Sequence, residues 1–155
     1  GVRESLLDLK RAGYLLIVIS NQGCIARGGA TLATVDRINQ RLHELLGEDQ
    51  RGRRLIDATY VCPFHPKGDP NGTGADFVAE HTWRKPRAGM ILAAAGEFRL
   101  DLQQCWLVGD AERDVEAGVN AGMERDRCLR VGPDAVFPDL SAAATHILET
   151  PCPRP

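Results

Sequence analysis

Polar side chains that could bind a ligand follow directly on an apolar run near the start of the chain. Residues 15–20, LLIVIS, form a run that is too short for a helix and is bounded by Gly13, so a buried parallel strand is expected. Ser20 and Asn21 stand at its carboxyl end, and Arg27 follows in a glycine-rich stretch. Because ligands of open α/β sheets collect at the carboxyl ends of strands, these residues are candidate ligand contacts. Alone, the stretch also fits an ordinary strand-to-loop turn with a surface arginine.

Two further groups of charged residues lie at the ends of later predicted elements. Asp110 follows the apolar run 105–108, and Asp114 lies four residues further on, about one turn along the helix expected there. Such a carboxylate pair could hold a hard cation, Mg²⁺ in particular, or could simply favour the positive end of the helix dipole. Arg84 and Lys85 precede another predicted helix, where phosphate oxygens are readily bound, although a basic dipeptide also fits solvated surface.

Alternating helices and short apolar runs must position these three groups. Helices are expected at 2–12, 31–46, 86–100 and around 115–122, and strands at 14–20, 58–62, 105–108 and 128–131, with 145–149 as a further candidate strand. The alternation predicts an α/β protein with a doubly wound parallel sheet. In such a sheet the residues after successive strands lie at one edge, so the three groups are expected to meet there.

The totals of the sequence limit its partners. A length of 155 residues suits a single domain, and a net charge of -2 gives no basic field for nucleic acid or a membrane surface. The longest apolar runs fall well short of the roughly 20 residues of a membrane span. Five scattered cysteines without a CxxC pair fit free thiols in a reducing compartment. We therefore expect a cytoplasmic monomer that acts on a small molecule, with neither nucleic-acid nor membrane partners.

Four segments together resemble the haloacid dehalogenase (HAD) superfamily of phosphohydrolases. They are residues 1–28, 60–66 (YVCPFHP), 83–90 (WRKPRAGM) and 107–122 (LVGDAERDVEAGVNAG). More narrowly, they look like the branch that contains histidinol-phosphatase and D-glycero-D-manno-heptose 1,7-bisphosphate phosphatase. The matching segments extend to about residue 132, and the combination of NQxxIARG, CPxHP and RKPxxGM is quite specific. The resemblance implies a Rossmannoid HAD-like fold and hydrolysis of a sugar phosphate, with the heptose bisphosphate as first candidate and histidinol phosphate as the alternative.

The resemblance also implies a role for each candidate residue. Ser20 and Asn21 would bind the transferred phosphoryl group, and Lys85 would neutralise the charge that spreads over its oxygens. Asp110 would coordinate Mg²⁺, with Asp114 in or near the second coordination shell. Arg27 and Arg84 would contact the phosphate or the sugar of the substrate. By this resemblance, Ser20, Lys85 and Asp110 are the predicted catalytic residues of this chain.

One departure from the family pattern concerns a structural zinc that members of this branch often carry in the long loop. Of the four corresponding positions only Cys62 keeps a family ligand; the others are Phe64, His81 and Trp83. His65 and His81 could in principle help, but three good tetrahedral ligands at the family spacing are absent. We expect no zinc, and we expect Phe64 and Trp83 to pack the loop apolarly instead.

The second departure concerns the nucleophile. The family begins with a strand that ends in DxDGT, whose first aspartate attacks phosphorus and whose second is the general acid and base. Nothing in this chain matches that motif, and Asp8 lies in the helix that should follow it. The missing strand is expected between 14–20 and 105–108, so two strand edges would lack partners. We therefore expect residues 1–155 to form an N-terminally incomplete, single HAD-like domain that is inactive alone; the alternative is a non-catalytic phosphate-binding module.

Overall fold

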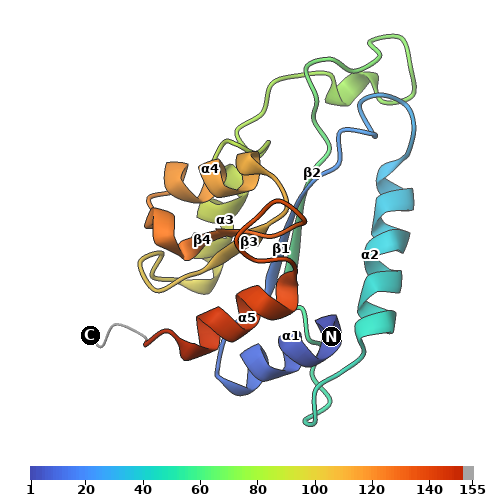
Figure 1. Ribbon diagram of the computed structural model, residues 1–155. Helices are drawn as coiled ribbons and strands as arrows, with labels where there is room; N and C mark the ends of the chain where they lie inside the picture. Colours follow the sequence, from blue (N-terminus) through green and yellow to red (C-terminus); the bar gives the residue numbers. More distant parts are fainter. Residues whose placement is uncertain (152–155) are drawn as a thin grey trace.

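The computed structural model describes residues 1–151 and confirms the α/β class that the sequence predicts. In chain order the elements are α1 (Val2–Arg11), β1 (Ile17–Asn21), α2 (Leu32–Leu46), β2 (Ala58–Cys62), η1 (Ala75–Phe77), α3 (Gly89–Phe98), β3 (Leu107–Gly109), α4 (Glu112–Asn120), η2 (Arg125–Arg127), β4 (Cys128–Arg130) and α5 (Leu140–Glu149). Figure 1 shows the glycine- and proline-rich loops after β1 and β2 gathered at one end of the molecule, with α1 and α5 at the other.

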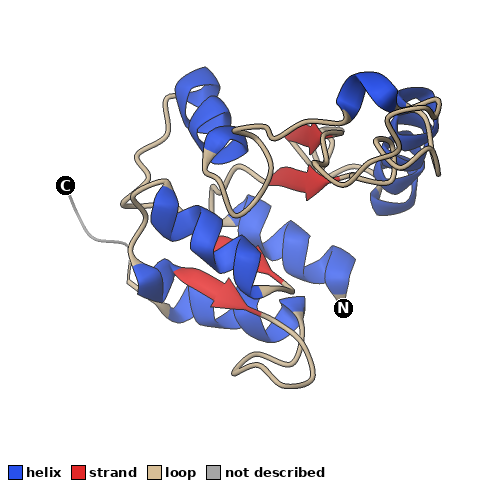
Figure 2. Cartoon of the chain, turned by 90° about the horizontal axis from the view of Figure 1, so that it is seen from above, coloured by secondary structure: helices blue, strands red, loops and turns tan. Residues whose placement is uncertain are grey.

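The strands form two separate parallel pairs. β1 pairs with β2, with Ile17 opposite Ala58, and β3 pairs with β4, with Leu107 opposite Cys128. Within residues 1–151, no strand joins the pairs, so the strands form two sheets of two strands each. The sequence analysis expected strand edges without partners between 14–20 and 105–108, and no described strand lies between β1 and β3. The two pairs stand apart when the molecule is seen from above (Figure 2).

Helices cover the strand pairs on two sides, as a doubly wound arrangement requires (Figure 1). On one side α3 and α4 pack over β3 and β4, and the buried residues of this core are Ile91, Leu107, Val115, Ala117, Met123 and Cys128. On the other side α1 and α5 pack together, with a core of Leu9, Leu129, Ala143, Ala144 and Ile147. The segment of β1 contributes to both cores, because alternate side chains of an extended chain point to opposite faces. Ile19 of β1 lies against the first core, and Leu16, the residue before β1, lies against the second.

The helix predicted from Thr31 forms as expected. The Thr31 side chain accepts a hydrogen bond from the Thr34 backbone N–H at 3.1 Å and so caps the amino end of α2. Much of this helix stays exposed, including Ile38 and Leu45, and Figure 1 shows it standing at the edge of the molecule. Neither α2 nor any other helix within residues 1–151 is long and apolar enough to cross a membrane.

The prediction of a last strand at 145–149 is wrong, because these residues belong to α5. The Asp139 carboxylate accepts a hydrogen bond from the Ala142 N–H at 2.9 Å and so starts the helix. Ala143 and Ile147 lie four residues apart on its buried face. Asp139 as an N-cap, followed by apolar residues at this spacing, is a helix signal in the sequence. The β-branched residues of THILE (145–149) instead favour a strand, and the prediction followed them.

The third predicted helix begins later than expected. The sequence places its start at Pro86, but the Lys85-Pro86 peptide bond is cis and α3 begins at Gly89. The segment before it turns back on itself, since the Gly89 N–H donates to the Thr82 carbonyl at 3.0 Å. Residues 84–88 therefore form a turn that projects Lys85 toward β1 rather than the first turn of a helix.

Candidate active site

A large open cleft, with a volume of about 1220 Å³, lies between β1 and β3. Its walls are mostly apolar side chains of the two strands and of the helices around them, including Ile17, Ile19 and Val108. Its polar lining includes four of the site residues that the sequence predicts: Ser20, Lys85, Asp110 and Asp114. The structure thus brings together residues that are up to 94 positions apart in the sequence, from Ser20 to Asp114.

Lys85 is held at the polar end of this cleft by contacts with β1 and α4. Its ammonium nitrogen Nζ lies 2.9 Å from the Ile19 carbonyl oxygen of β1 and 2.8 Å from the Asp114 carboxylate of α4. The Lys85 side chain is 12% exposed and that of Asp114 is 6% exposed. A nearly dehydrated ammonium at this place can compensate the charge of a phosphoryl group far better than a solvated surface lysine can.

Asn21 fixes the backbone of Lys85. The Asn21 side-chain nitrogen donates to the Lys85 carbonyl at 3.0 Å, and the Lys85 N–H donates to the Asn21 side-chain oxygen, also at 3.0 Å. The sequence assigned Asn21 to the phosphoryl group, whereas the structure shows its amide engaged with the RKP turn. This positioning role carries no sequence signal of its own, because it depends on where the turn of residues 84–88 folds.

Asp114 combines two structural roles. One carboxylate oxygen pairs with Lys85, and the other accepts a hydrogen bond from the Ala111 N–H at 2.9 Å, which closes the start of α4. Burial alone would raise the pKa of Asp114, but the hydrogen bonds from Lys85 and Ala111 and the lysine charge outweigh it and hold this pKa below its ordinary value. Asp114 is therefore a buried anion committed to Lys85, whereas Asp110 is exposed at the mouth of the cleft.

The other predicted ligands surround the loop that follows β1. The Ser20 hydroxyl accepts a hydrogen bond from the Gln22 side-chain amide at 2.9 Å and keeps its own proton available as a donor. The Arg84 guanidinium donates to the Phe64 carbonyl at 3.1 Å, while Arg27 is exposed. The sequence did not anticipate the role of Gln22, since an amide two residues after a serine is common.

Oxygen ligands for a hard cation are present only in part. Asp110 offers an exposed carboxylate at the cleft, which is the donor type that Mg²⁺ prefers. Asp114 already pairs with Lys85, and within residues 1–151 no three His, Cys, Asp or Glu side chains are grouped so as to hold a metal ion. Among the described residues, Asp110 could therefore supply one ligand to a magnesium ion but not a complete site.

A stack of rings closes the long loop after β2, as the sequence predicts for Phe64 and Trp83. Phe64 stacks face to face on His81 with ring centroids 4.2 Å apart and meets Phe77 edge-on at 5.5 Å. Trp83 meets Tyr60 edge-on at 5.9 Å. Aromatic pairs of this kind stabilise a loop without any metal ligand.

We expect purified protein to contain far less than one zinc ion per chain by elemental analysis. Burial raises the pKa of the Cys62 thiol, which disfavours the thiolate that zinc requires, and His81 is occupied by its stack on Phe64. The matched comparison is Cys62→Ser, which should leave the metal content unchanged. Stoichiometric zinc that disappears in Cys62→Ser would contradict the prediction.

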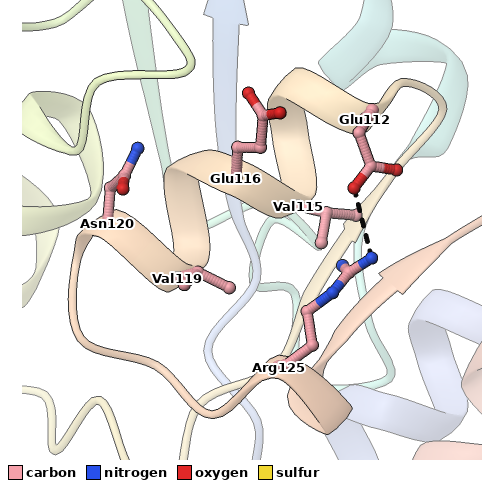
Figure 3. Close-up of a pocket in the computed structure, with 6 residues that line it drawn as sticks. All are labelled: Glu112, Val115, Glu116, Val119, Asn120 and Arg125. Atoms are coloured by element: carbon pink, nitrogen blue, oxygen red, sulfur yellow. Dashed lines mark hydrogen bonds and ion pairs between the residues drawn. The ribbon is translucent and has the colours of Figure 1, made fainter.

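A second, shallow depression lies on the outer face of α4, where Figure 3 shows Glu112 and Arg125 facing each other. Their ion pair, at 3.2 Å, joins two side chains that are both more than half exposed. Exposed pairs of this kind contribute little to stability or binding. Lys85 and Ser20 do not line this depression, so the cleft between β1 and β3 is the better candidate site.

Similarity to known proteins agrees with the geometry of the cleft. Residues 82–143 match the family model described as HAD-hydrolase-like. The D-glycero-D-manno-heptose-1,7-bisphosphate 7-phosphatase of Thermosynechococcus vestitus is 34% identical, over 99% of this chain and 84% of that protein. The chain belongs to the HAD-type heptose bisphosphate phosphatases. The D-glycero-beta-D-manno-heptose-1,7-bisphosphate 7-phosphatase of Escherichia coli K12 is 30% identical, over 97% of this chain and 74% of the relative.

A solved structure of the same HAD family supports the fold. The crystal structure of D,D-heptose 1,7-bisphosphate phosphatase from B. bronchiseptica, complexed with magnesium and phosphate, superposes with a TM-score of 0.73 and 26% sequence identity. The similarity covers 96% of this chain and 82% of that one. These findings confirm the family and the phosphatase class inferred from the sequence, while the roles of individual site residues remain predictions.

Proposed function

We propose that this HAD phosphatase chain supplies the phosphate-binding end of an enzyme that hydrolyses D-glycero-D-manno-heptose 1,7-bisphosphate. The observation that carries the proposal is the position of Lys85, whose nearly buried ammonium lies at the polar end of the cleft between β1 and Asp114. The named relatives supply the substrate class. In this reading Lys85 neutralises the transferred phosphoryl group and Ser20 donates a hydrogen bond to it. Asp110 would hold Mg²⁺, which when bound would supply positive charge to offset the charge of the phosphate.

We further propose that the nucleophile stands on a strand that fills the cleft between β1 and β3. The Leu16 carbonyl, just before β1, accepts a hydrogen bond from the Asp57 N–H at 2.8 Å, and the Gln22 N–H, just after β1, donates to the Cys62 carbonyl at 2.8 Å. The backbone polar groups of the even-numbered residues in this segment therefore face β2. Backbone polar groups alternate between the two edges of a strand, and those of Ile17 and Ile19 therefore face the cleft.

The same reasoning applies to β3. The Val131 N–H donates to the Gly109 carbonyl at 2.9 Å, so the backbone polar groups of Gly109 face β4. Those of Val108, the neighbouring residue, therefore face the cleft. Two parallel strands thus turn edges without a strand partner toward one largely apolar cleft, where the Ile19 carbonyl accepts a hydrogen bond from Lys85. A parallel strand between them would satisfy both edges and would end beside Ser20 and Lys85. An aspartate at its carboxyl end could attack phosphorus, displace the sugar oxygen and form an aspartyl phosphate for water to hydrolyse.

The test is a substrate panel with a strand-completed protein, meaning residues 1–155 preceded by 25 to 30 residues, on the order of one strand and its connection, that end the strand in DxDGT. We expect this protein to hydrolyse the heptose bisphosphate more efficiently than histidinol phosphate or p-nitrophenyl phosphate. Asp110→Asn should lower kcat/KM by about 100-fold or more, since a bound metal ion supplies several kcal/mol. The matched control is Asp126→Asn, an exposed acid in η2.

Two outcomes would favour another candidate function. Preference for histidinol phosphate would replace the proposed substrate by the alternative that the sequence left open. Phosphate binding without turnover of any substrate would favour a non-catalytic binding module. The monomeric state and the cytoplasmic location expected from the sequence remain predictions.

A further inference from the structure

His81 begins the turn that leads into Arg84 and Lys85. Its carbonyl accepts a hydrogen bond from the Arg84 N–H at 3.1 Å, which closes a β-turn over residues 81–84. Its ring nitrogen Nδ1 accepts a second hydrogen bond from the Trp83 N–H, also at 3.1 Å. A side-chain acceptor that binds the N–H two residues further on is the device by which Asn and Asp fix turns. His81 thus binds two consecutive backbone N–H groups, one with its ring and one with its main chain.

The ring of His81 is held from its other side by Phe64, which lies two residues after the end of β2. The two rings stack with their centroids 4.2 Å apart and an angle of 6° between their planes. The Phe64 carbonyl in turn accepts a hydrogen bond from the Arg84 guanidinium at 3.1 Å. Both ends of the 81–84 turn are therefore attached to the chain that leaves β2.

The position of this turn decides where Lys85 lies. Arg84 ends the 81–84 turn and also begins the next one, because its carbonyl accepts a hydrogen bond from the Arg87 N–H at 2.9 Å. Lys85 is the second residue of that next turn, and its N–H donates to the Asn21 side-chain oxygen at 3.0 Å. Its ammonium contacts β1 at 2.9 Å and α4 at 2.8 Å, so a shift of about 1 Å would break one of these contacts.

We propose that His81 is a positioning residue for Lys85, and that its ring nitrogen Nδ1 sets the course of the turn. With the Trp83 N–H bound to Nδ1, the 81–84 turn directs Lys85 to the polar end of the cleft. Without this acceptor, a partly buried backbone N–H inside the turn lacks a partner, and the turn opens to reach water. The inference rests on the proposed function, because its effect on turnover requires that Lys85 neutralise the transferred phosphoryl group.

A role of His81 in loop stability alone would depend on its ring rather than on Nδ1. Two substitutions separate these roles. His81→Phe keeps a flat ring that can stack on Phe64 but removes the acceptor. His81→Asn removes the stack but keeps a side-chain oxygen that can accept from the N–H two residues further on. If Nδ1 positions Lys85, His81→Phe is the slower enzyme, and if the ring alone matters, His81→Asn is.

The experiment measures steady-state kinetics of the strand-completed protein. His81→Phe should lower kcat for the heptose bisphosphate by about tenfold with little change in KM, because a displaced ammonium loses its interaction with the transition state. His81→Asn should keep kcat within about twofold of wild type. The matched control is His146→Phe on α5, which also replaces an imidazole among aromatic rings and should leave kcat unchanged. Circular dichroism shows whether each variant folds, and Phe64→Leu, which removes the stack and keeps Nδ1, replaces His81→Asn if that variant does not.

A second measurement does not depend on turnover. The Lys85 amide proton is bound to the Asn21 side chain, so its exchange with deuterium reports whether the turn is in place. In His81→Phe this proton should exchange about tenfold faster than in wild type, and in His81→Asn at the wild-type rate. The Gln22 amide, which donates to the Cys62 carbonyl, should keep its rate in both variants and so excludes general unfolding as the cause.

The outcomes distinguish this inference from the proposed function. If wild type and His81→Phe hydrolyse the bisphosphate with the same kcat, the role of His81 is overturned while the function stands. If His81→Asn is slower than His81→Phe, the ring rather than Nδ1 is responsible, and the inference is overturned as well. If no substrate is turned over, the proposed function fails and the Lys85 amide alone decides on His81: equal exchange rates in wild type and His81→Phe overturn the inference.

Discussion

Replacing Lys85 with methionine should lower the free energy of unfolding by about 3 kcal/mol at pH 7, in addition to removing activity from the strand-completed protein. The Asp114 carboxylate is 6% exposed and would lose the ammonium 2.8 Å away, and the Ile19 carbonyl would lose its donor. Removing one partner of a buried pair leaves an uncompensated charge, which costs more than the pair itself contributes. Urea denaturation of the two proteins measures the difference.

Two further variants identify the cause of this loss. The double variant Lys85→Met with Asp114→Asn should recover most of the stability, because an amide can still accept the Ala111 hydrogen bond without carrying a charge. The matched control is Lys10→Met: Lys10 pairs with Asp57 at 2.7 Å, but Asp57 is 21% exposed and can be solvated, so a smaller loss is expected. Equal losses in Lys85→Met and Lys10→Met would show that burial of Asp114 is not the reason.

The pH dependence of the same variants should have opposite signs. In the wild type the pKa of folded Asp114 is lowered, so its contribution to stability is present above the unfolded pKa of about 3.9 and is lost as pH falls through the folded value. Without Lys85, burial raises the pKa of Asp114, and the variant gains stability relative to wild type as pH falls toward about 4. A stability deficit that does not shrink at acid pH would contradict this account.

The sequence predicted which residues belong to the candidate site better than it predicted the contacts between them. Ser20, Lys85, Asp110 and Asp114 could be placed at one edge because residues that follow parallel strands must meet there. The pairing of Lys85 with Asp114 could not be predicted, since it depends on the turn of residues 84–88, which a helix starting at Pro86 would have directed elsewhere. Asn21 shows the same limit, because its amide binds the backbone of that turn rather than pointing into open space.

The sheet shows how local patterns and pairing differ in predictability. Each strand is a short apolar run bounded by glycine, proline or polar residues, and four of the predicted runs are strands within residues 1–151. Whether a strand is paired on both edges depends on which other strands lie beside it, and the composition of the strand does not show this. β1 and β3 have the composition of buried strands, yet their facing edges bound a cleft because no described strand separates them.

The strand-completed protein should be more stable than the 155-residue chain by several kcal/mol, with a melting temperature higher by about 10 °C. β1 has five residues, and a strand of similar length would pair with the backbone edges at Ile17, Ile19 and Val108, except for the Ile19 carbonyl that accepts from Lys85. Each new hydrogen bond contributes about 0.5–1.5 kcal/mol, and each large apolar side chain buried in the cleft about 1.5–3 kcal/mol. Typical domain stability is about 5–15 kcal/mol, so the chain without this strand should be marginal.

Hydrogen exchange can locate the gain. The amide protons of Ile17, Ile19 and Val108 should exchange more slowly in the strand-completed protein, because their N–H groups face the cleft. The amide of Gln22 already donates to Cys62 and serves as the internal control. A version whose strand carries serine in place of its apolar residues should show neither the protection nor the higher melting temperature.

Activity should depend on the same strand through one carboxylate. The strand-completed protein with its first motif aspartate changed to asparagine should keep the raised melting temperature and the slow exchange but lose measurable turnover, because an amide cannot form the aspartyl phosphate. The 155-residue chain alone should show no hydrolysis of p-nitrophenyl phosphate with Mg²⁺. Turnover by that chain, abolished by Asp110→Asn, would mean that a carboxylate within it attacks phosphorus. A completed protein that melts no higher and stays inert would instead show that the cleft takes something other than a strand, and the binding-module alternative would then account better for Lys85 and its neighbours.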